Sequence, residues 1–216
     1  MNRKKIRLIY NIIMIVLVLY AWLIMFFNTE ESMLTSKGFI NLKYFTTLSN
    51  IFAAIVAVIW TVNYLNKKDE DKMRIWKLMS ASAVGLTFTV VLTFLGPLYG
   101  FGTMYVGSNF FLHMLVPLMA MAEFLIFNDK KISIKKNTGV IAAPLIYGTV
   151  YLVNTIINGK KGNDIYGFLN WGYPVGILIF GMICIATYLI GLLLIALNNL
   201  IYRKSRSIND RNDDAS

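Results

Sequence analysis

The sequence predicts an all-α integral membrane protein, a bundle of six transmembrane helices with both termini in the cytoplasm. Hydrophobic residues make up 57% of the 216 residues, above the 45–50% of soluble domains. The apolar residues form runs of about twenty, the length that a helix needs to cross a bilayer. Charged residues are concentrated between these runs and at the two ends.

The first apolar run covers residues 8–27 and follows the basic start MNRKKIR. A signal peptide has a shorter apolar core and a small-residue cleavage site behind it. Here the polar stretch NTEE follows instead, so we expect an uncleaved first helix. The other predicted spans are residues 44–65, 75–98, 109–127, 139–157 and 172–202.

The spans leave room for one domain, residues 1–202, and a tail, residues 203–216, whose polar sequence predicts disorder. Seventeen Lys and Arg residues fall in the N-terminus, the second connection taken together with Lys77, the fourth connection and the tail, against four in the other connections. By the positive-inside rule this bias places both termini in the cytoplasm of a multi-pass cell-membrane protein.

The net charge of +10 indicates topology signals and lipid-headgroup contacts, so no nucleic-acid partner is expected. The single cysteine, Cys184, excludes an internal disulfide and a cysteine-based zinc site. A single histidine without nearby carboxylates is no metal site either. The sequence therefore predicts neither a metal nor a cofactor.

The stretch NFFLHMLVPLMAMAEFLIF, residues 109–127, holds the only histidine, His113. An ionisable residue inside a membrane span is a functional hypothesis by default. Pro117 is expected to kink this helix one turn below the histidine and to open space for a pocket. Glu123 lies near the cytoplasmic end, where we expect its side chain to extend toward Lys130 or Lys131.

Most polar residues within the spans fall in the outer half of the bundle. Thr46, Thr47, Ser49 and Asn50 lie in the outer turns of the second span, close to the depth of His113. Thr46 and Asn50 share a helix face because they are four residues apart. Other polar or amphipathic side chains predicted near this level are Tyr44, Thr89, Thr93, Asn109, Asn154, Asn170, Trp171 and Tyr173.

A hydroxyl at the depth of the only histidine suggests a nucleophile and its base. The histidine takes the hydroxyl proton and later returns it to the leaving group, and a third group usually orients the imidazole. Spacing alone does not separate Thr46 from Thr47 or Ser49. The orienting group is also open: the candidates are a backbone carbonyl or the side chains of Asn50, Asn109, Asn154 and Tyr173.

Two motifs, KYFTTLSN at residues 43–50 and HMLVP at residues 113–117, resemble those of the androgen-induced and androgen-dependent six-helix membrane proteins, and SN at residues 49–50 is the bacterial form. The pair Tyr173–Pro174 after Trp171 is similar to the family's opening of the last helix. Animal members are threonine hydrolases of fatty acid esters of hydroxy fatty acids. The resemblance implies Thr46 as nucleophile and His113 as base.

The expected function is therefore hydrolysis of a lipid acyl ester near the outer leaflet. Tyr44, Asn50, Asn109, Asn154, Trp171 and Tyr173 are the expected supporting or substrate-binding residues. The partner would be a membrane lipid or lipid ester. The alternatives are a lipid acyltransferase built on the same pair and a non-catalytic transporter or binding protein, although the absence of an internal repeat argues against the transporter.

Overall fold

The computed structural model describes residues 2–27, 38–69 and 71–213, and these residues form helices and no strand. Within them, six helical segments are long and apolar enough to cross a membrane. The predicted all-α fold with six spans is thereby confirmed. The predicted first connection lies partly outside the described residues, as do position 70 and the last three residues of the tail.

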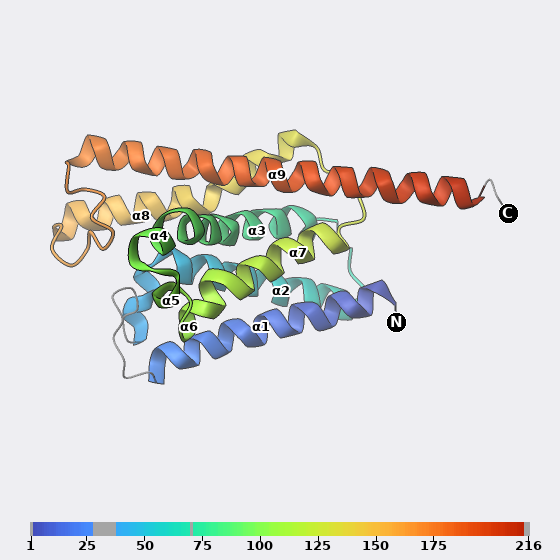
Figure 1. The fold of residues 1–216 in the computed structure, drawn as a ribbon, viewed down its shortest axis with the longest axis horizontal. Coiled ribbons are helices and arrows are strands. Elements are labelled where there is room, and N and C mark those ends of the chain that lie inside the picture. The colour runs from blue at the N-terminus through green and yellow to red at the C-terminus, as the bar shows by residue number, and fades with distance from the viewer. Residues whose placement is uncertain (1, 28–37, 70, 214–216) are drawn as a thin grey trace.

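The first half of the chain forms three of the spanning segments (Figure 1). A short 3-10 helix, η1, precedes the second span, and a π-helical turn, η2, interrupts the third. The elements are α1 (Arg3–Phe27), η1 (Gly38–Lys43), α2 (Phe45–Leu65), α3 (Met73–Val90), η2 (Val91–Leu95) and α4 (Gly96–Tyr99).

The second half of the chain contains another π-helical turn and ends in the longest helix. A π-helical turn, η3, interrupts the fourth span, and a 3-10 helix, η4, opens the fifth. The elements are α5 (Phe101–Met104), α6 (Ser108–Phe110), η3 (Phe111–Leu115), α7 (Val116–Phe127), η4 (Ile134–Ile141), α8 (Ala142–Asn158) and α9 (Tyr173–Asp213).

Helix α3 lies at the centre of the bundle because its middle, Ser80–Gly85, consists mainly of small residues that let neighbouring helices approach closely. Two buried clusters meet on it. Val84 packs with residues of α1, α2 and α7, whereas Leu78 and Ala81 pack with residues of α7, η4 and α9. Helix α8 contacts mainly α9 and η4 and lies at the edge of the bundle.

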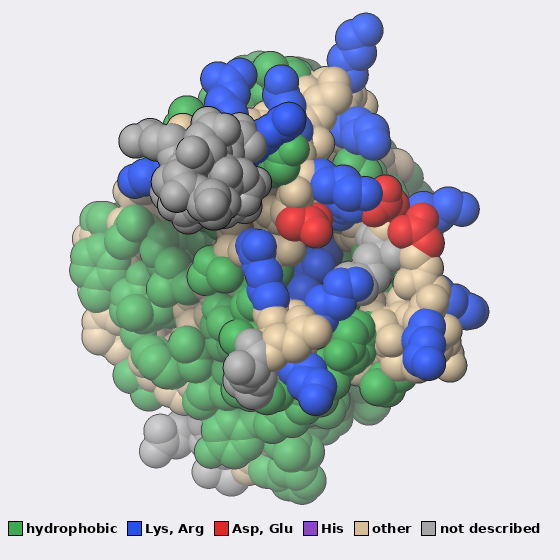
Figure 2. Space-filling model, turned by 90° about the vertical axis from the view of Figure 1, so that its right-hand side faces the viewer, with side chains coloured by type: hydrophobic (Ala, Val, Ile, Leu, Met, Phe, Trp, Pro, Cys, Tyr) green, Lys and Arg blue, Asp and Glu red, His purple; other side chains and the backbone are tan. Residues whose placement is uncertain are grey.

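Both ends of the described chain lie at the same end of the bundle (Figure 1). Lys and Arg side chains gather on that end, around a few acidic ones (Figure 2). We call it the basic end, and the end where α1 stops and α2 begins the opposite end. The clustering matches the charge bias in the sequence. The predicted site residues of α2 lie at the opposite end, because α2 begins there.

Two helices are longer than predicted. Helix α1 begins at Arg3 instead of residue 8, and α9 continues to Asp213 where the sequence favours a disordered tail. The physical reason is cooperativity: once a spanning helix exists, each added residue gains a backbone hydrogen bond without a new nucleation cost. Polar composition alone therefore does not end a helix that is already formed.

Candidate functional site

A small cavity of about 40 Å³ lies at the opposite end of the bundle. Thr46 and His113, the two residues predicted to do chemistry, both line it, together with Tyr44 and Asn109. They come from the start of α2 and from the segment α6–η3, which are distant in sequence. The rest of the lining consists of Met25, Asn41, Thr47, Leu95, Leu112 and Tyr166.

The start of α2 is fixed by a residue from the connection between α8 and α9. Tyr44 has an extended backbone, and the N–H of the next residue, Phe45, donates a hydrogen bond to the Tyr166 hydroxyl at 3.0 Å. Burial raises the pKa of Tyr166 to about 12. The phenol therefore stays protonated at neutral pH, and its hydroxyl also hydrogen-bonds with the hydroxyl of Tyr147.

His113 is held by a backbone carbonyl. Its Nδ1 lies 3.0 Å from the carbonyl oxygen of Met104. A carbonyl only accepts hydrogen bonds, so Nδ1 carries the hydrogen and Nε2 is left with its lone pair. This is the tautomer that a general base needs. His113 as a whole is 5% exposed, so the surrounding side chains also restrict the orientation of the imidazole.

The chain reversal between the third and fourth spans brings Met104 beside the histidine. Helix α5 is flanked by Gly100 and Gly107, which have φ angles of +87° and +57°. These left-handed conformations favour glycine, and they let the chain turn twice within a few residues. Met104, at the end of α5, is fully buried beneath this turn.

His113 lies inside the π turn η3, and Leu95 of the cavity wall lies inside the π turn η2. Each turn ends two residues before a proline, Pro117 and Pro97 respectively. Proline has no N–H for the carbonyl four residues earlier and its ring crowds that carbonyl, so an α-helical turn is disfavoured there. We attribute both π turns to these prolines, and π turns recur at functional sites.

Asn50 joins α2 to the histidine segment without lining the cavity. Its amide nitrogen donates to the carbonyls of Thr46 at 2.8 Å and Leu112 at 3.0 Å. Both amide hydrogens are thereby used, so Asn50 has none for a substrate. Its supporting role is to hold the first turn of α2 against η3.

The three candidate hydroxyls occupy different environments. Ser49 lies outside the lining of this cavity, and its hydroxyl lies 3.0 Å from the carbonyl oxygen of Thr46 and 3.2 Å from the hydroxyl of Thr87. Thr47 lines the cavity but is only 2% exposed, whereas Thr46 is partly exposed. Accessibility to a substrate therefore favours Thr46.

Three predicted supporting residues lie elsewhere. Asn154 donates a hydrogen bond to Asn163 at 3.1 Å and lines a different, larger groove. Trp171 is 73% exposed, and the ring of Tyr173 lies 5.3 Å from Nζ of Lys160. These side chains are not among those that line the Thr46–His113 cavity.

Sequence reasoning missed Tyr166, Asn41 and Met104. Tyr166 belongs to a connection that is distant from the cavity along the chain, so no spacing rule relates it to α2. Met104 acts through its carbonyl, which is independent of residue type. The one signal in the sequence was the pair of prolines, Pro97 and Pro117, each of which follows a π turn that carries a residue of the cavity wall.

The larger groove, of about 670 Å³, lies between α2, α3 and α8. Its lining is mostly apolar and includes Leu48, Phe52, Ile146 and Val150. The residues of α2 that line it, such as Phe45 and Leu48, alternate with those that line the Thr46–His113 cavity. The first turn of α2 therefore separates the two spaces.

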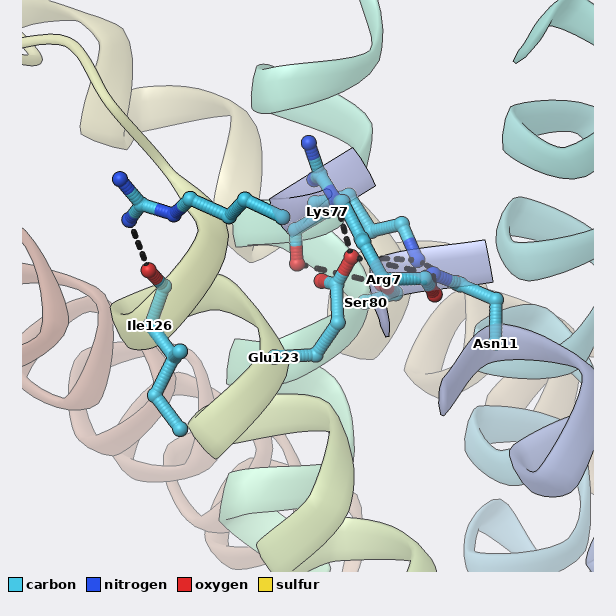
Figure 3. A network of polar contacts seen from close by, with 7 residues as sticks. Arg7, Asn11, Lys77, Ser80, Glu123 and Ile126 are labelled. Atoms are coloured by element: carbon cyan, nitrogen blue, oxygen red, sulfur yellow. Dashed lines mark hydrogen bonds and ion pairs between the residues drawn. The ribbon is translucent and has the colours of Figure 1, made fainter. Parts of the chain in front are cut away.

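Glu123 corrects an expectation from the sequence. Its carboxylate is fully buried, and Oε1 lies 2.7 Å from Nε of Arg7 and 3.2 Å from Nζ of Lys77. Asn11 bridges the group by donating to Oε1 and accepting from Lys77 (Figure 3). The side chain therefore pairs with cations of α1 and α3, and not with Lys130 or its neighbour.

No protein-family model, curated protein or solved structure matches this chain.

Proposed function

We propose that this protein is an integral membrane hydrolase of lipid acyl esters, with Thr46 as nucleophile and His113 as general base. One observation supports it most: the two side chains line a single cavity, and the hydrogen bond from Nδ1 to Met104 leaves Nε2 as the basic nitrogen. The resemblance of the KYFTTLSN and HMLVP motifs to threonine hydrolases points to the same pair.

In the proposed reaction, the Thr46 hydroxyl oxygen attacks the ester carbonyl carbon while Nε2 of His113 takes the hydroxyl proton. The tetrahedral intermediate collapses, the bond to the alcohol oxygen breaks, and His113 gives its proton to that oxygen. Water then attacks the acyl-threonine, His113 takes a proton from the water, and the proton returns to the threonine oxygen. The products are an alcohol and a carboxylic acid.

The oxyanion of each intermediate needs donors that are already in place. Two groups in the cavity wall suit that role, the side-chain amide of Asn109 and the hydroxyl of Tyr166. Tyr166 keeps its proton because burial raises its pKa to about 12. We assign both as candidate oxyanion donors.

The basic end is proposed to face the cytoplasm. Lys and Arg side chains gather there, which is the arrangement that the positive-inside rule associates with cytoplasmic termini. The Thr46–His113 cavity would then lie near the outer leaflet of the cell membrane.

Labelling of the purified protein with a fluorophosphonate, which traps activated hydroxyl nucleophiles, tests the proposal. We expect the parent to be labelled and Thr46→Ala to abolish labelling. We expect His113→Ala to slow it by about 10²–10⁴-fold, the usual contribution of a general base. Thr47→Ala and Ser49→Ala are matched controls that remove a neighbouring hydroxyl, and both should still be labelled.

The outcomes separate the alternatives. Loss of labelling in Thr47→Ala, with Thr46→Ala unaffected, would move the nucleophile by one residue. If the parent unfolds cooperatively on heating and yet is not labelled, the proposed chemistry is wrong. A non-catalytic lipid-binding protein then becomes the better hypothesis, and the 670 Å³ apolar groove is the observation that favours it. Trapping by a lipid alcohol in place of water would indicate an acyltransferase.

A further inference from the structure

The groove between α2, α3 and α8 opens sideways onto the apolar exterior of the bundle. Ile146 and Val150, on its α8 side, are 64% and 63% exposed, in the middle of a membrane-spanning segment. Its volume of about 670 Å³ is within the range of small-molecule sites. In a bilayer, this side of a membrane-spanning segment faces lipid and not water.

The length of the groove matches one lipid leaflet. Along α8 its lining extends from Ala142 to Asn154, which corresponds to roughly 18 Å at the rise of an α-helix. Half of the hydrocarbon core of a bilayer is about 15 Å thick. One extended acyl chain from one leaflet therefore fits along it.

The two ends of the groove differ in polarity. Lys43, Asn154 and Asn163 line it at the opposite end of the bundle, and Lys43 is the one charged side chain among the described residues that line it. Phe52 and Trp76 line the groove farther from Lys43, and their rings contact each other edge to face with centroids 6.2 Å apart. A ligand with one anionic head and one apolar tail matches this gradient.

We propose that the groove binds a fatty acid, with its carboxylate at Lys43 and its chain running along α8 toward Trp76. The site is separate from the Thr46–His113 cavity because the first turn of α2 lies between them. It does not depend on the proposed catalytic chemistry, and Thr46→Ala is expected to bind the fatty acid as the parent does.

Trp76 offers a direct readout. A fatty acid with bromine on its last carbon quenches a tryptophan that it touches, and in the proposed orientation the bromine lies at Trp76. In nanodiscs we expect saturable quenching of the parent and loss of that component in Trp76→Phe. We also expect Ala143→Phe, which fills the groove, to abolish the saturable component. Val153→Phe is its matched control, since it adds the same ring to α8 outside the lining.

The head-group assignment is tested by charge. Lys43→Gln should weaken binding of the bromo fatty acid by about five-fold, the effect of about 1 kcal/mol for one lysine near a membrane surface. Lys161→Gln, which removes a charge from the same end outside the lining, should leave binding unchanged. The corresponding bromo alcohol should bind the parent and Lys43→Gln equally.

Two results would overturn the inference. Quenching that does not saturate, or that survives Ala143→Phe in full, would mean that bulk lipid and not a bound ligand contacts Trp76. Equal binding of the acid and the alcohol by the parent would remove the carboxylate from the proposal. Neither result affects fluorophosphonate labelling, so this inference and the catalytic proposal fail independently.

Discussion

The orientation of His113 depends on one hydrogen bond to a backbone carbonyl, and that limits what the residues alone can predict. The hypothesis that Thr46 pairs with His113 needed only their chemistry and their similar predicted depth in the membrane. The partner of Nδ1 could not be chosen, because every residue offers a carbonyl and only the folded path of the chain selects Met104. Tyr166 was out of reach for a similar reason, since it lies in a distant connection.

Glu123 shows how sequence proximity can suggest the wrong ion-pair partner. The nearby lysines Lys130 and Lys131 were the obvious candidates in sequence, but both belong to the connection between α7 and η4. Arg7 and Lys77 instead approach from two neighbouring helices and reach the carboxylate without leaving the core. Burying a carboxylate is costly unless it is paired, so the packed cations decide the outcome.

We expect Glu123→Gln to lower the free energy of unfolding by about 3–5 kcal/mol. The amide keeps the shape of the side chain but leaves two buried cations facing a neutral group, and breaking a buried pair on one side carries a cost of that size. Thermal unfolding can be followed with a thiol-reactive dye at Cys184, the only cysteine of the chain.

Asp71→Asn is the matched control for this substitution. Asp71 also pairs with two cations, Arg74 and Lys130, but it lies at the surface of the basic end, where solvent screens the pairs. The hydrogen bond from Lys130 lowers the pKa of Asp71. Any stabilisation by this pair is therefore present above the ordinary carboxyl pKa and is lost as the pH falls below it. Equal effects of the two substitutions at neutral pH would contradict the assigned role of Glu123.

At the level of elements, the apolar runs were sufficient to locate every spanning helix within the described chain. Twenty consecutive apolar residues have few other stable structures, which is why all six spans were located, although α1 and α9 extend beyond their apolar runs. A kink at Pro117 was expected, but the two π turns were not predicted, because proline in a membrane helix is compatible with a kink, a π turn or a break. Neighbouring helices select among these, as Asn50 does by binding the carbonyl of Leu112.

Helix α9 approaches η4 closely at one glycine. A β-carbon on Gly191 would collide with the Asn137 side chain and would lie 3.1 Å from both methyl groups of Val140. Asn137 is fully buried and donates to the carbonyl of Tyr188 at 2.8 Å, so it is not free to move away. We expect Gly191→Ala to destabilise the protein by about 1–3 kcal/mol, the usual cost of overpacking.

Gly181→Ala provides the comparison on the same helix. A β-carbon there would meet no atom within 4 Å. Alanine is the better helix former by about 1 kcal/mol, so we expect an unchanged or slightly higher unfolding temperature. The thiol-reactive dye assay reports both variants, and a lower stability of Gly181→Ala than of Gly191→Ala would contradict the observed packing of α9.

At the scale of the whole molecule, the positions of the two chain ends allow the membrane topology to be tested. Both lie at the basic end, and an even number of crossings requires this. We expect a fluorescent protein that matures only in the cytoplasm to be bright when it is fused after Asp213. We expect alkaline phosphatase, which is active only outside the cytoplasm, to be inactive at the same position.

The complementary fusion point lies in the connection between α8 and α9. Alkaline phosphatase fused after Asn163 should be active, and the fluorescent protein fused there should be dark. The reverse pattern at both positions would invert the proposed orientation and would place the Thr46–His113 cavity near the inner leaflet. The hydrolase hypothesis would survive that result, but its substrates would have to come from the cytoplasmic side.

The two π turns also determine how the bundle is assembled along its length. A π turn contains one residue more than the α turn that it replaces, so each acts as a single-residue insertion within a helix. One residue of an α-helix corresponds to a rotation of about 100°. Deleting one residue from η2 or from η3 would therefore rotate the two parts of that span by about 100° relative to each other. The segments of these two spans that line the Thr46–His113 cavity are thus each offset by one position from the segments that pack toward the basic end.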